Sequence, residues 1–451
     1  MFRLFAGFTA KESRQEVIVT NKMISSVMKK KLAVVSLGLI ICASILIVLK
    51  VQAQQQAQQQ TPTPQTTPTP NLKSVRGIEN ASALDRFFKS LSGVKRRIEP
   101  VRIMHFGDSH TAADILTAQI RNQFQRDFGD GGAGYMVPGN PMKSTPRRGV
   151  ISGATSGWSV DGLGSHAEPN GIYGLAGMSL ATTEANQSAW LETACNHFEV
   201  YYLRQPGGGT IDILLDGQSV LEQPISLASD APLPDYYTFD TPADRLHRVE
   251  VRTVASGKTR IMGIVTEHIA PGVSYDVLGI NGARAKRLIS WNDTAFVDNI
   301  VQRKPDLIIV AYGTNEVTDD DWTVESYERM FAGILRRFRR AAPQASIIVY
   351  GPPDRGDVAL AGAKMPAMIE AQRRAAFEVG AAFWSSYGAM GGGGSMNVWA
   401  SYGLGQGDHV HLTKEGYLRM GTMFYEDIMD AYKKYLTRTP RTTPQRRTGR
   451  E

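Results

Sequence analysis

One short stretch, VRIMHFGDSHTAADI at residues 101–115, places Ser109 between an aspartate and a histidine. An apolar run precedes the serine and a helical pattern follows it, which predicts a strand-to-helix turn. Asp and Ser are common at such turns, because their side-chain oxygens accept hydrogen bonds from the first N–H groups of a helix. Alternatively, Ser109 is a nucleophile, which requires a base and further hydrogen-bond donors from elsewhere in the chain.

Three later segments contain residue types that could assist a serine. GINGA (279–283) follows the strand-like run SYDVL, and GTNE (313–316) follows the apolar run DLIIVAY. GDHVHLTKEGY (407–417) precedes the last helical pattern. In an open parallel sheet the reactive site lies beyond the carboxyl ends of the strands. We therefore expect these segments to meet Ser109 at one edge of such a sheet.

The elements that must position these segments alternate between strands and helices. Apolar runs at 101–106, 306–313 and 346–351 predict buried strands, and each is followed by a helical pattern. In the helix after the second run, Tyr327 and Phe331 begin an apolar stripe. Short apolar strands separated by amphipathic helices predict a parallel sheet covered on both faces, in an α/β fold.

Residues 150–268 have a different pattern. HFEVYYL, TIDILLDGQSVL, HRVEVRTV and KTRIMGIV are strand-like, and Asp216-Gly217 and Ser256-Gly257 are typical of hairpin turns. We expect a separate antiparallel β-sandwich that interrupts the α/β domain after its first strand-helix unit. Such an insertion is tolerated where its two ends lie close together at a loop.

Four ordered blocks of this chain resemble those of the SGNH, or GDSL-like, hydrolases. The first is the Gly-Asp-Ser turn that ends at Ser109, the second contains Gly282, and the third is Gly-Thr-Asn ending at Asn315. Asp408 and His411 form the final Asp-x-x-His block. The resemblance implies a three-layer α/β sandwich with a central parallel sheet, and the activity of a serine ester hydrolase.

Acyl-transfer chemistry explains these residue types. The Ser109 hydroxyl needs a base, which His411 can provide near neutral pH. Asp408 can accept a hydrogen bond from the other imidazole nitrogen and stabilise the imidazolium. The backbone N–H groups of Ser109 and Gly282 and the side-chain amide of Asn315 would donate to the oxyanion. The alternatives are purely structural: capping by Ser109 and Asn315, and relief of a tight turn by Gly282.

Four further residues are candidates for substrate contact. His110 replaces the leucine that is common after the serine in the family, and it either lines the site or bonds to a neighbouring loop. His409 is a rival base, but it adjoins Asp408 and its side chain should point elsewhere. Trp158 and Trp190 in the insert could stack on sugars, although aromatic residues of a β-sandwich are more often core residues.

A narrower resemblance is to the extracytoplasmic peptidoglycan O-acetylesterases. It is carried by GDSHTAADILTAQIRNQFQRDFGDGGAGYMVP and FWSSYGAMGGGGSMNVWASYGLGQGDHVHLT, and it covers most of residues 76–436. In that family a β-sandwich resembling a carbohydrate-binding module accompanies the SGNH domain. The family removes the O-6 acetyl group of N-acetylmuramic acid, so the resemblance implies an acetylated cell-wall glycan as the partner.

The ends of the chain have the composition of targeting and tail segments. KKK at 29–31 precedes an uncharged apolar run at 32–49 that is just long enough to cross a bilayer. Lysines before the run and few after it place the N-terminus in the cytoplasm and the bulk outside, in the periplasm or cell envelope. A cleaved signal is the alternative, because VQA at 51–53 has the small residues of a cleavage site. The expected segments are a basic cytoplasmic N-terminus (1–31), a transmembrane signal anchor (32–49), a Gln/Thr/Pro-rich linker (50–75), two parts of the hydrolase domain (76–149 and 269–436) around the β-sandwich insert (150–268), and a basic disordered tail (437–451).

Charge and cysteine content bear on nucleic-acid binding, disulfides and metal sites. The formal net charge of +7 comes from the ends, since residues 1–31 carry +5, residues 437–451 carry +4, and the stretch between them carries −2. No basic groove for nucleic acid is therefore expected. The two cysteines, Cys42 in the apolar run and Cys195, cannot form a disulfide within the external part. Neither cysteine has metal-ligand spacing, and we expect no metal and no cofactor.

Three classes of function fit the sequence. The favoured one is a serine O-acetylesterase acting on cell-wall glycan, most of all peptidoglycan, with another acetylated polysaccharide or a lipid ester as alternative substrates. The second is an O-acetyltransferase that uses the same triad with a sugar hydroxyl in place of water. The third is a wall-binding protein without activity, but the presence of Ser109, His411, Asp408 and Asn315 together argues against it.

Overall fold

Five parallel strands form the small sheet in the computed structural model, which describes residues 72–439 except 140, 142–146, 163–170 and 358. These strands are β1 (Val101–Gly107), β12 (Val273–Gly279), β13 (Leu307–Ala311), β14 (Ser346–Gly351) and β15 (Ala382–Ser385). Their order in space is β12-β1-β13-β14-β15, so the direction of winding reverses between β1 and β13. Open α/β sheets bind ligands outside the carboxyl ends of the strands at such a reversal.

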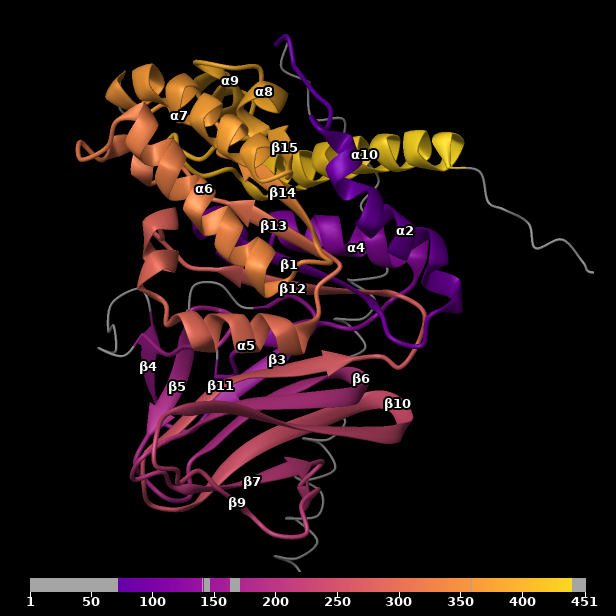
Figure 1. Ribbon diagram of the computed structural model, residues 1–451, viewed down its shortest axis with the longest axis vertical. Helices are drawn as coiled ribbons and strands as arrows, with labels where there is room; N and C mark the ends of the chain where they lie inside the picture. The colour runs from indigo at the N-terminus through magenta and orange to yellow at the C-terminus, as the bar shows by residue number, and fades with distance from the viewer. Residues whose placement is uncertain (1–71, 140, 142–146, 163–170, 358, 440–451) are drawn as a thin grey trace, which may run out of the picture. The chain divides into compact units, whose positions relative to one another are not determined.

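Helices cover both faces of the small sheet (Figure 1). Side chains of a strand alternate between faces, so Val101 and Ile103 of β1 pack in one core while Met104 and Phe106 pack in the other. One face is covered by α5 (Asp293–Arg303), α6 (Val324–Ala341) and α7 (Ala359–Glu378), and the other by α2 (Asp85–Gly93), α4 (Leu116–Phe128) and α10 (Lys414–Arg438). Shorter helical segments are η1 (Ala81–Leu84), η2 (Val94–Arg96), α3 (Ser109–Ala112), η3 (Ala285–Ser290), η4 (Glu316–Thr318), α8 (Ser386–Met390) and α9 (Ser395–Ser401). The α/β fold with a parallel sheet that the sequence predicts is confirmed.

Ten antiparallel strands form the large sheet. In chain order they all lie between β1 and β12, the first and second strands of the small sheet. The ten strands are β2 (Gly134–Met136), β3 (Ile151–Ala154), β4 (Ser159–Gly162), β5 (Met178–Thr182), β6 (Ser188–Arg204), β7 (Thr210–Leu215), β8 (Gln218–Ser219), β9 (Ile225–Ser226), β10 (Leu233–Ala255) and β11 (Thr259–Glu267). The path runs β4-β5-β11-β6-β10-β7-β8, with β2, β3 and β9 paired to β11, β6 and β7. The turn at Asp216-Gly217 joins β7 to β8, and both residues have positive φ, as a tight hairpin requires.

The large sheet is less separate than the sequence suggests. Hydrogen bonds connect all ten strands in one sheet, so the expected two-sheet sandwich is not confirmed. Tyr201 of β6 and Met262 of β11 pack in the same hydrophobic core as Ile308 of β13 and Phe338 of α6. The large sheet therefore contributes to the core that supports the small sheet.

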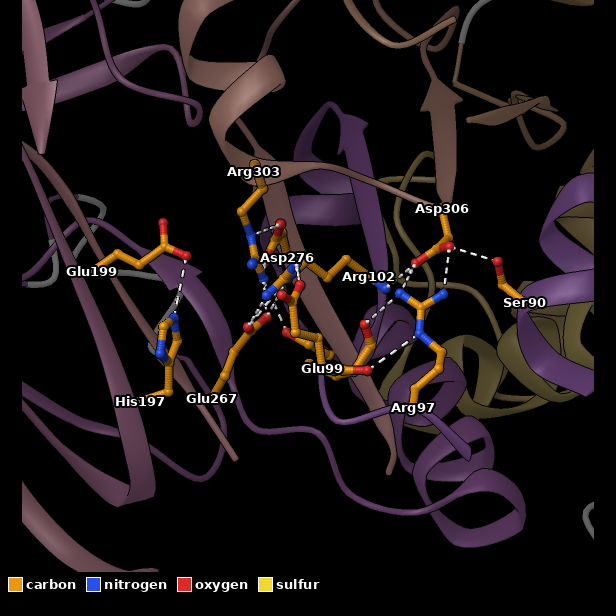
Figure 2. Close-up of polar contacts among 12 residues, drawn as sticks. Ser90, Arg97, Glu99, Arg102, His197, Glu199, Glu267, Asp276, Arg303 and Asp306 are labelled. Atoms are coloured by element: carbon orange, nitrogen blue, oxygen red, sulfur yellow. Dashed lines mark hydrogen bonds and ion pairs between the residues drawn. The ribbon is translucent and has the colours of Figure 1, made fainter. Parts of the chain in front are cut away.

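A buried network of ion pairs joins the two sheets, as Figure 2 shows. The guanidinium of Arg303 in α5 donates to Glu267 of β11 at 2.6 Å and to Asp276 of β12 at 2.8 and 2.9 Å. Arg102 of β1 also donates to Glu267, at 2.8 Å. Burial acts to raise the pKa of Glu267, but the two arginines outweigh it and lower the pKa to about 2. A carboxylate on one sheet and a carboxylate on the other thus share one buried guanidinium.

The segments expected to span and follow a membrane, residues 32–49 and 50–71, lie outside the described residues. Among the helices that the structure describes, none is both long and apolar enough to cross a bilayer. The tail from residue 440 onward is likewise outside the described part of the chain.

Candidate active site

Ser109 is the first residue of α3 and stands directly after the turn that ends β1. The carboxylate of Asp108 caps this turn by accepting the backbone N–H of His110 at 3.0 Å. Gly107 permits the close turn, because a Cβ at this position would lie 2.0 Å from Thr111 Oγ1 and 2.8 Å from the Ala311 carbonyl oxygen. The hydroxyl of Ser109 is therefore held at the carboxyl end of β1, which lies between β12 and β13.

The structure brings Ser109, His411 and Asp408 together. Ser109 Oγ lies 2.9 Å from His411 Nε2, although 302 positions separate the two residues. On the other side of the ring, His411 Nδ1 lies 2.6 Å from Asp408 Oδ2. A carboxylate beside Nδ1 favours the tautomer that carries its proton there, which leaves Nε2 able to accept the serine proton.

Asp408 is fixed by the turn on which it stands. Its Oδ1 accepts the backbone N–H groups of Val410 at 3.0 Å and of His411 at 2.9 Å. Partial burial acts to raise the pKa of Asp408, but the hydrogen bonds from the His411 ring and from these two N–H groups outweigh it and lower the pKa to about 2. The carboxylate is therefore ionised at neutral pH and orients the imidazole.

The loop that carries Gly282 is connected to both neighbouring strand ends. Ile280 donates its backbone N–H to the carbonyl of Gly107 at 3.0 Å, and Asn315 Nδ2 donates to the carbonyl of Ala283 at 2.9 Å. Gly282 is exposed at the tip of this loop, with φ of 68°. Within the described part of the chain, the backbone N–H groups of Ser109 and Gly282 donate to no backbone carbonyl. These two donors and the second N–H of Asn315 are the groups available to an oxyanion.

Two fully buried carboxyl groups lie behind this edge of the sheet. Burial raises the pKa of Asp108 to about 6 and that of Glu316 to about 7. Glu316, the last residue of GTNE, is not among the site residues that the sequence predicts. Its position directly after the block residue Asn315 is a signal that could have drawn attention to it.

His110 and His409 occupy distinct environments beside the triad. His110 is buried, and its Nδ1 lies 2.9 Å from the Tyr417 hydroxyl while its ring centre is 5.3 Å from that of His411. Burial lowers the pKa of His110 to about 3, so the ring is neutral at physiological pH. His409 has a φ of 53°, and its backbone bonds to Gln406 and Gly356. The hydroxyl of Ser109 is bonded to His411, and not to His409.

The other candidates for ligand contact are held within the large sheet. The Trp158 Nε1–H donates to the Ser188 carbonyl at 3.1 Å, and the Trp190 ring lies 4.1 Å beneath the guanidinium of Arg248. No recorded contact joins either tryptophan to Ser109 or its partners in the described residues. Among those residues there is also no group of three or more His, Cys, Asp or Glu side chains that could hold a metal ion.

A family model matches the part of the chain that contains the last three hydrolase blocks. Residues 253–419 match the model of the GDSL-like Lipase/Acylhydrolase family, a segment that includes Gly282, Asn315, Asp408 and His411. No curated protein matches the chain. The solved structure of a peptidoglycan O-acetylesterase has 25% sequence identity and a TM-score of 0.67, and the match covers 79% of this chain and 98% of that one.

More distant matches include carbohydrate esterases. A family two carbohydrate esterase from Cellvibrio japonicus has 14% identity, a TM-score of 0.28, and a match covering 67% of this chain and 98% of its own. A family two carbohydrate esterase from Clostridium thermocellum, solved with cellohexaose, has 12% identity, a TM-score of 0.27, and coverages of 62% and 100%. From the family match and the peptidoglycan O-acetylesterase structure together, the chain carries a GDSL-like lipase/acylhydrolase domain and is an ester hydrolase of the SGNH type.

Proposed function

We propose that the protein is a serine esterase that removes O-acetyl groups from a cell-wall polysaccharide, and that its substrate is peptidoglycan acetylated on N-acetylmuramic acid. The observation that carries the chemistry is the continuous line of hydrogen bonds from Ser109 Oγ through His411 to Asp408, at 2.9 and 2.6 Å. This arrangement stands at the carboxyl edge of the small sheet, where open α/β folds bind ligands.

The reaction follows from these contacts. Ser109 Oγ attacks the acetyl carbonyl while its proton passes to His411 Nε2, and Asp408 stabilises the imidazolium. His411 then returns the proton to the sugar oxygen as the ester C–O bond breaks, which leaves an acetyl group on Ser109. Water, deprotonated by His411, attacks this acyl-enzyme, and the breakdown of the second tetrahedral intermediate releases acetate and restores the Ser109 hydroxyl.

We assign stabilisation of the oxyanion to donors at the ends of β1, β12 and β13. These are the backbone N–H groups of Ser109 and Gly282 and the second N–H of the Asn315 side chain. Loss of one such donor typically reduces kcat by roughly 10²–10³-fold. Because one N–H of Asn315 already bonds to Ala283, the amide is held in place before substrate arrives.

The assignment to a polymeric glycan has two supports. The solved structure with 25% identity is that of a peptidoglycan O-acetylesterase. In addition, the side chains of Asp408 and His411 are 45% and 34% exposed, so the triad lies near the surface of the described chain. An ester attached to a bulky polymer needs such an accessible nucleophile, whereas a deeply enclosed site suits small free esters.

The sequence also supports a location for the reaction. We propose that the apolar run 32–49 anchors the chain in the cytoplasmic membrane and that the enzyme works outside it, in the periplasm or cell envelope. A Gln/Thr/Pro-rich linker between the anchor and the enzyme would give the site reach toward the wall.

Acetate release tests the proposal directly. The purified protein should release acetate from O-acetylated peptidoglycan, Ser109→Ala should reduce the rate by at least 10³-fold, and peptidoglycan stripped of O-acetyl groups should give no product. Adding an unacetylated glycan acceptor distinguishes the transferase, which would move acetyl groups to the acceptor at the expense of free acetate. Equal rates on unrelated acetylated polysaccharides, or full activity of the Ser109→Ala protein, would overturn the proposal.

A further inference from the structure

The segment from Gly279 to Ala285 is held at several points, and the exposed tip that contains Gly282 lies between them. At its beginning, Ile280 bonds to Gly107, which is two residues before Ser109. At its end, the segment is held by the stretch 315–321, which follows β13. The position of the Gly282 N–H relative to Ser109 is therefore determined by contacts that lie outside Gly282 itself.

Three kinds of contact join the end of this segment to 315–321. The carbonyl of Ala283 accepts Asn315 Nδ2, and Arg284 makes a two-point ion pair with Asp319 at 2.7 and 2.8 Å. The shortest contact to the backbone comes from Glu316, whose Oε1 accepts the N–H of Ala285 at 2.7 Å. The Glu316 residue is 3% exposed, whereas the side chain of Arg284 is 30% exposed and open to competition from water.

The two carboxyl oxygens of Glu316 differ in their hydrogen bonding. Glu316 Oε2 is buried and has no hydrogen-bond partner among the described residues. An unpaired buried carboxyl oxygen costs stability, because it loses its hydrogen bonds to water on burial. A buried carboxyl group with this cost invites a functional explanation. Among the described residues, the bond to Ala285 is the one that joins this carboxyl to the Gly282 segment.

We propose that Glu316 is a positioning residue for the oxyanion hole: by holding the Ala285 N–H, its carboxyl oxygen fixes the Gly282 backbone N–H at the site where charge develops on the substrate. The inference rests on the proposed function, because it assumes that Gly282 serves the Ser109 acyl transfer. Glu316 touches neither the substrate nor Ser109, and it acts through the backbone between residues 282 and 285.

The role requires a hydrogen-bond acceptor and not a negative charge. Burial raises the pKa of Glu316 to about 7, so a large fraction of the carboxyl is neutral at neutral pH. A neutral group beside an oxyanion hole also avoids repelling the charge that forms there. Gln, which retains the acceptor oxygen at the same distance from the backbone, should therefore replace Glu316, whereas Leu should not.

The expected effect lies on kcat. If Gly282 moves away from its position, the transition state loses part of one donor while the neutral ester binds as before. We expect Glu316→Leu to reduce kcat for a small aryl acetate by roughly tenfold or more with KM changed less than threefold, and Glu316→Gln to restore at least a third of wild-type kcat. Affinity for an alkyl boronic acid, which forms a tetrahedral adduct on Ser109, should fall in Glu316→Leu by the same factor as kcat.

Two further variants keep the test decisive. Val317→Ala removes buried volume from the next residue without touching the Ala285 bond, and it should lower the melting temperature while leaving kcat within twofold. If Glu316→Leu does not fold, Glu316→Asp, which shortens the side chain by one methylene, should show the same loss of kcat and boronate affinity.

The outcomes separate this inference from the proposed function. If Ser109→Ala abolishes activity but Glu316→Leu retains full kcat, or if its loss equals that of Val317→Ala, the positioning role is wrong and the esterase assignment stands. If Ser109→Ala retains activity, the proposed function itself is wrong. If Glu316→Gln is as impaired as Glu316→Leu, the acceptor role is refuted.

Discussion

Replacement of Asp408 by Asn and by Ala separates two contributions of this carboxylate. In Asp408→Asn, the amide oxygen can keep the backbone N–H groups of Val410 and His411, which are 3.0 and 2.9 Å from Oδ1 in the native side chain. The NH₂ group must then face His411 Nδ1, where Oδ2 now accepts at 2.6 Å. An N–H donor at this place forces the imidazole proton onto Nε2, so His411 can no longer accept the proton of Ser109.

The magnitudes follow from this difference. An imidazole locked in the wrong tautomer costs about 10⁴-fold in kcat in a triad of this type. In Asp408→Ala no group enforces a tautomer, and water can reach the ring because the His411 side chain is 34% exposed. That variant loses mainly a charge-assisted hydrogen bond to the imidazolium, worth about 1.5–3 kcal/mol, or roughly 10–200-fold in rate.

The assay is steady-state hydrolysis of a small aryl acetate by both variants and by His411→Ala. We expect Asp408→Asn to be at least tenfold slower than Asp408→Ala, with KM changed less than threefold in both, because Asp408 contacts His411 and no part of the acyl group. An Asp408→Asn protein as active as Asp408→Ala would refute the tautomer argument. A greater loss on replacing His409 than on replacing His411 would refute the triad.

Two other predictions concern the junction of the sheets and the anchor. Glu267→Gln leaves Arg102 and Arg303 without their shared buried carboxylate. We expect this change to lower the free energy of unfolding, measured by guanidinium titration, by about 3–5 kcal/mol. A decrease below about 1 kcal/mol would show that these ion pairs contribute little to stability. The pKa of Glu267 is about 2 in the folded chain and 4.5 without the fold, so its contribution to stability is fully present above pH 4.5 and is lost as pH falls toward 2; this part of the acid sensitivity should be missing in Glu267→Gln. The full chain should sediment with membranes and resist carbonate extraction, while a chain that begins at residue 72 should be soluble; recovery of the intact full chain in the soluble fraction would rule out the anchor.

Local sequence was sufficient for the parts of the site that depend on short separations. The Asp-x-x-His spacing places both side chains on one turn, where Asp408 can bond to the ring and to the backbone at once. The Gly-Asp-Ser stretch likewise predicts a tight turn. In the structure Asp108 caps this turn, and the space at position 107 is too small for any side chain. Such contacts form between residues a few positions apart, so residue type and spacing determine them.

Residue types alone did not predict how the large sheet is assembled. The strand patterns and the hairpin at Asp216-Gly217 are present, but the expected sandwich is not confirmed, because hydrogen bonds connect all ten strands in one sheet. Alternation of apolar residues tells which face of a strand is buried, yet it does not tell which edges pair. Here β6, with 17 residues, pairs with β10, β11 and β3 along its length, and β10, with 23 residues, also pairs with β7.

The sequence by itself therefore determined the α/β class, the position of the nucleophile at a strand end and the family that the chain resembles, because these depend on periodicity and on short motifs. Only the tertiary structure decided that His411 and not His409 meets Ser109, that His110 turns its Nδ1 to Tyr417, and that Glu316 holds the segment of Gly282. Each of these contacts joins residues from different strand ends or loops. Their geometry depends on the order of the strands in the sheet and on which buried polar groups need a hydrogen-bond partner. The spacing of neighbouring residues determines neither of these.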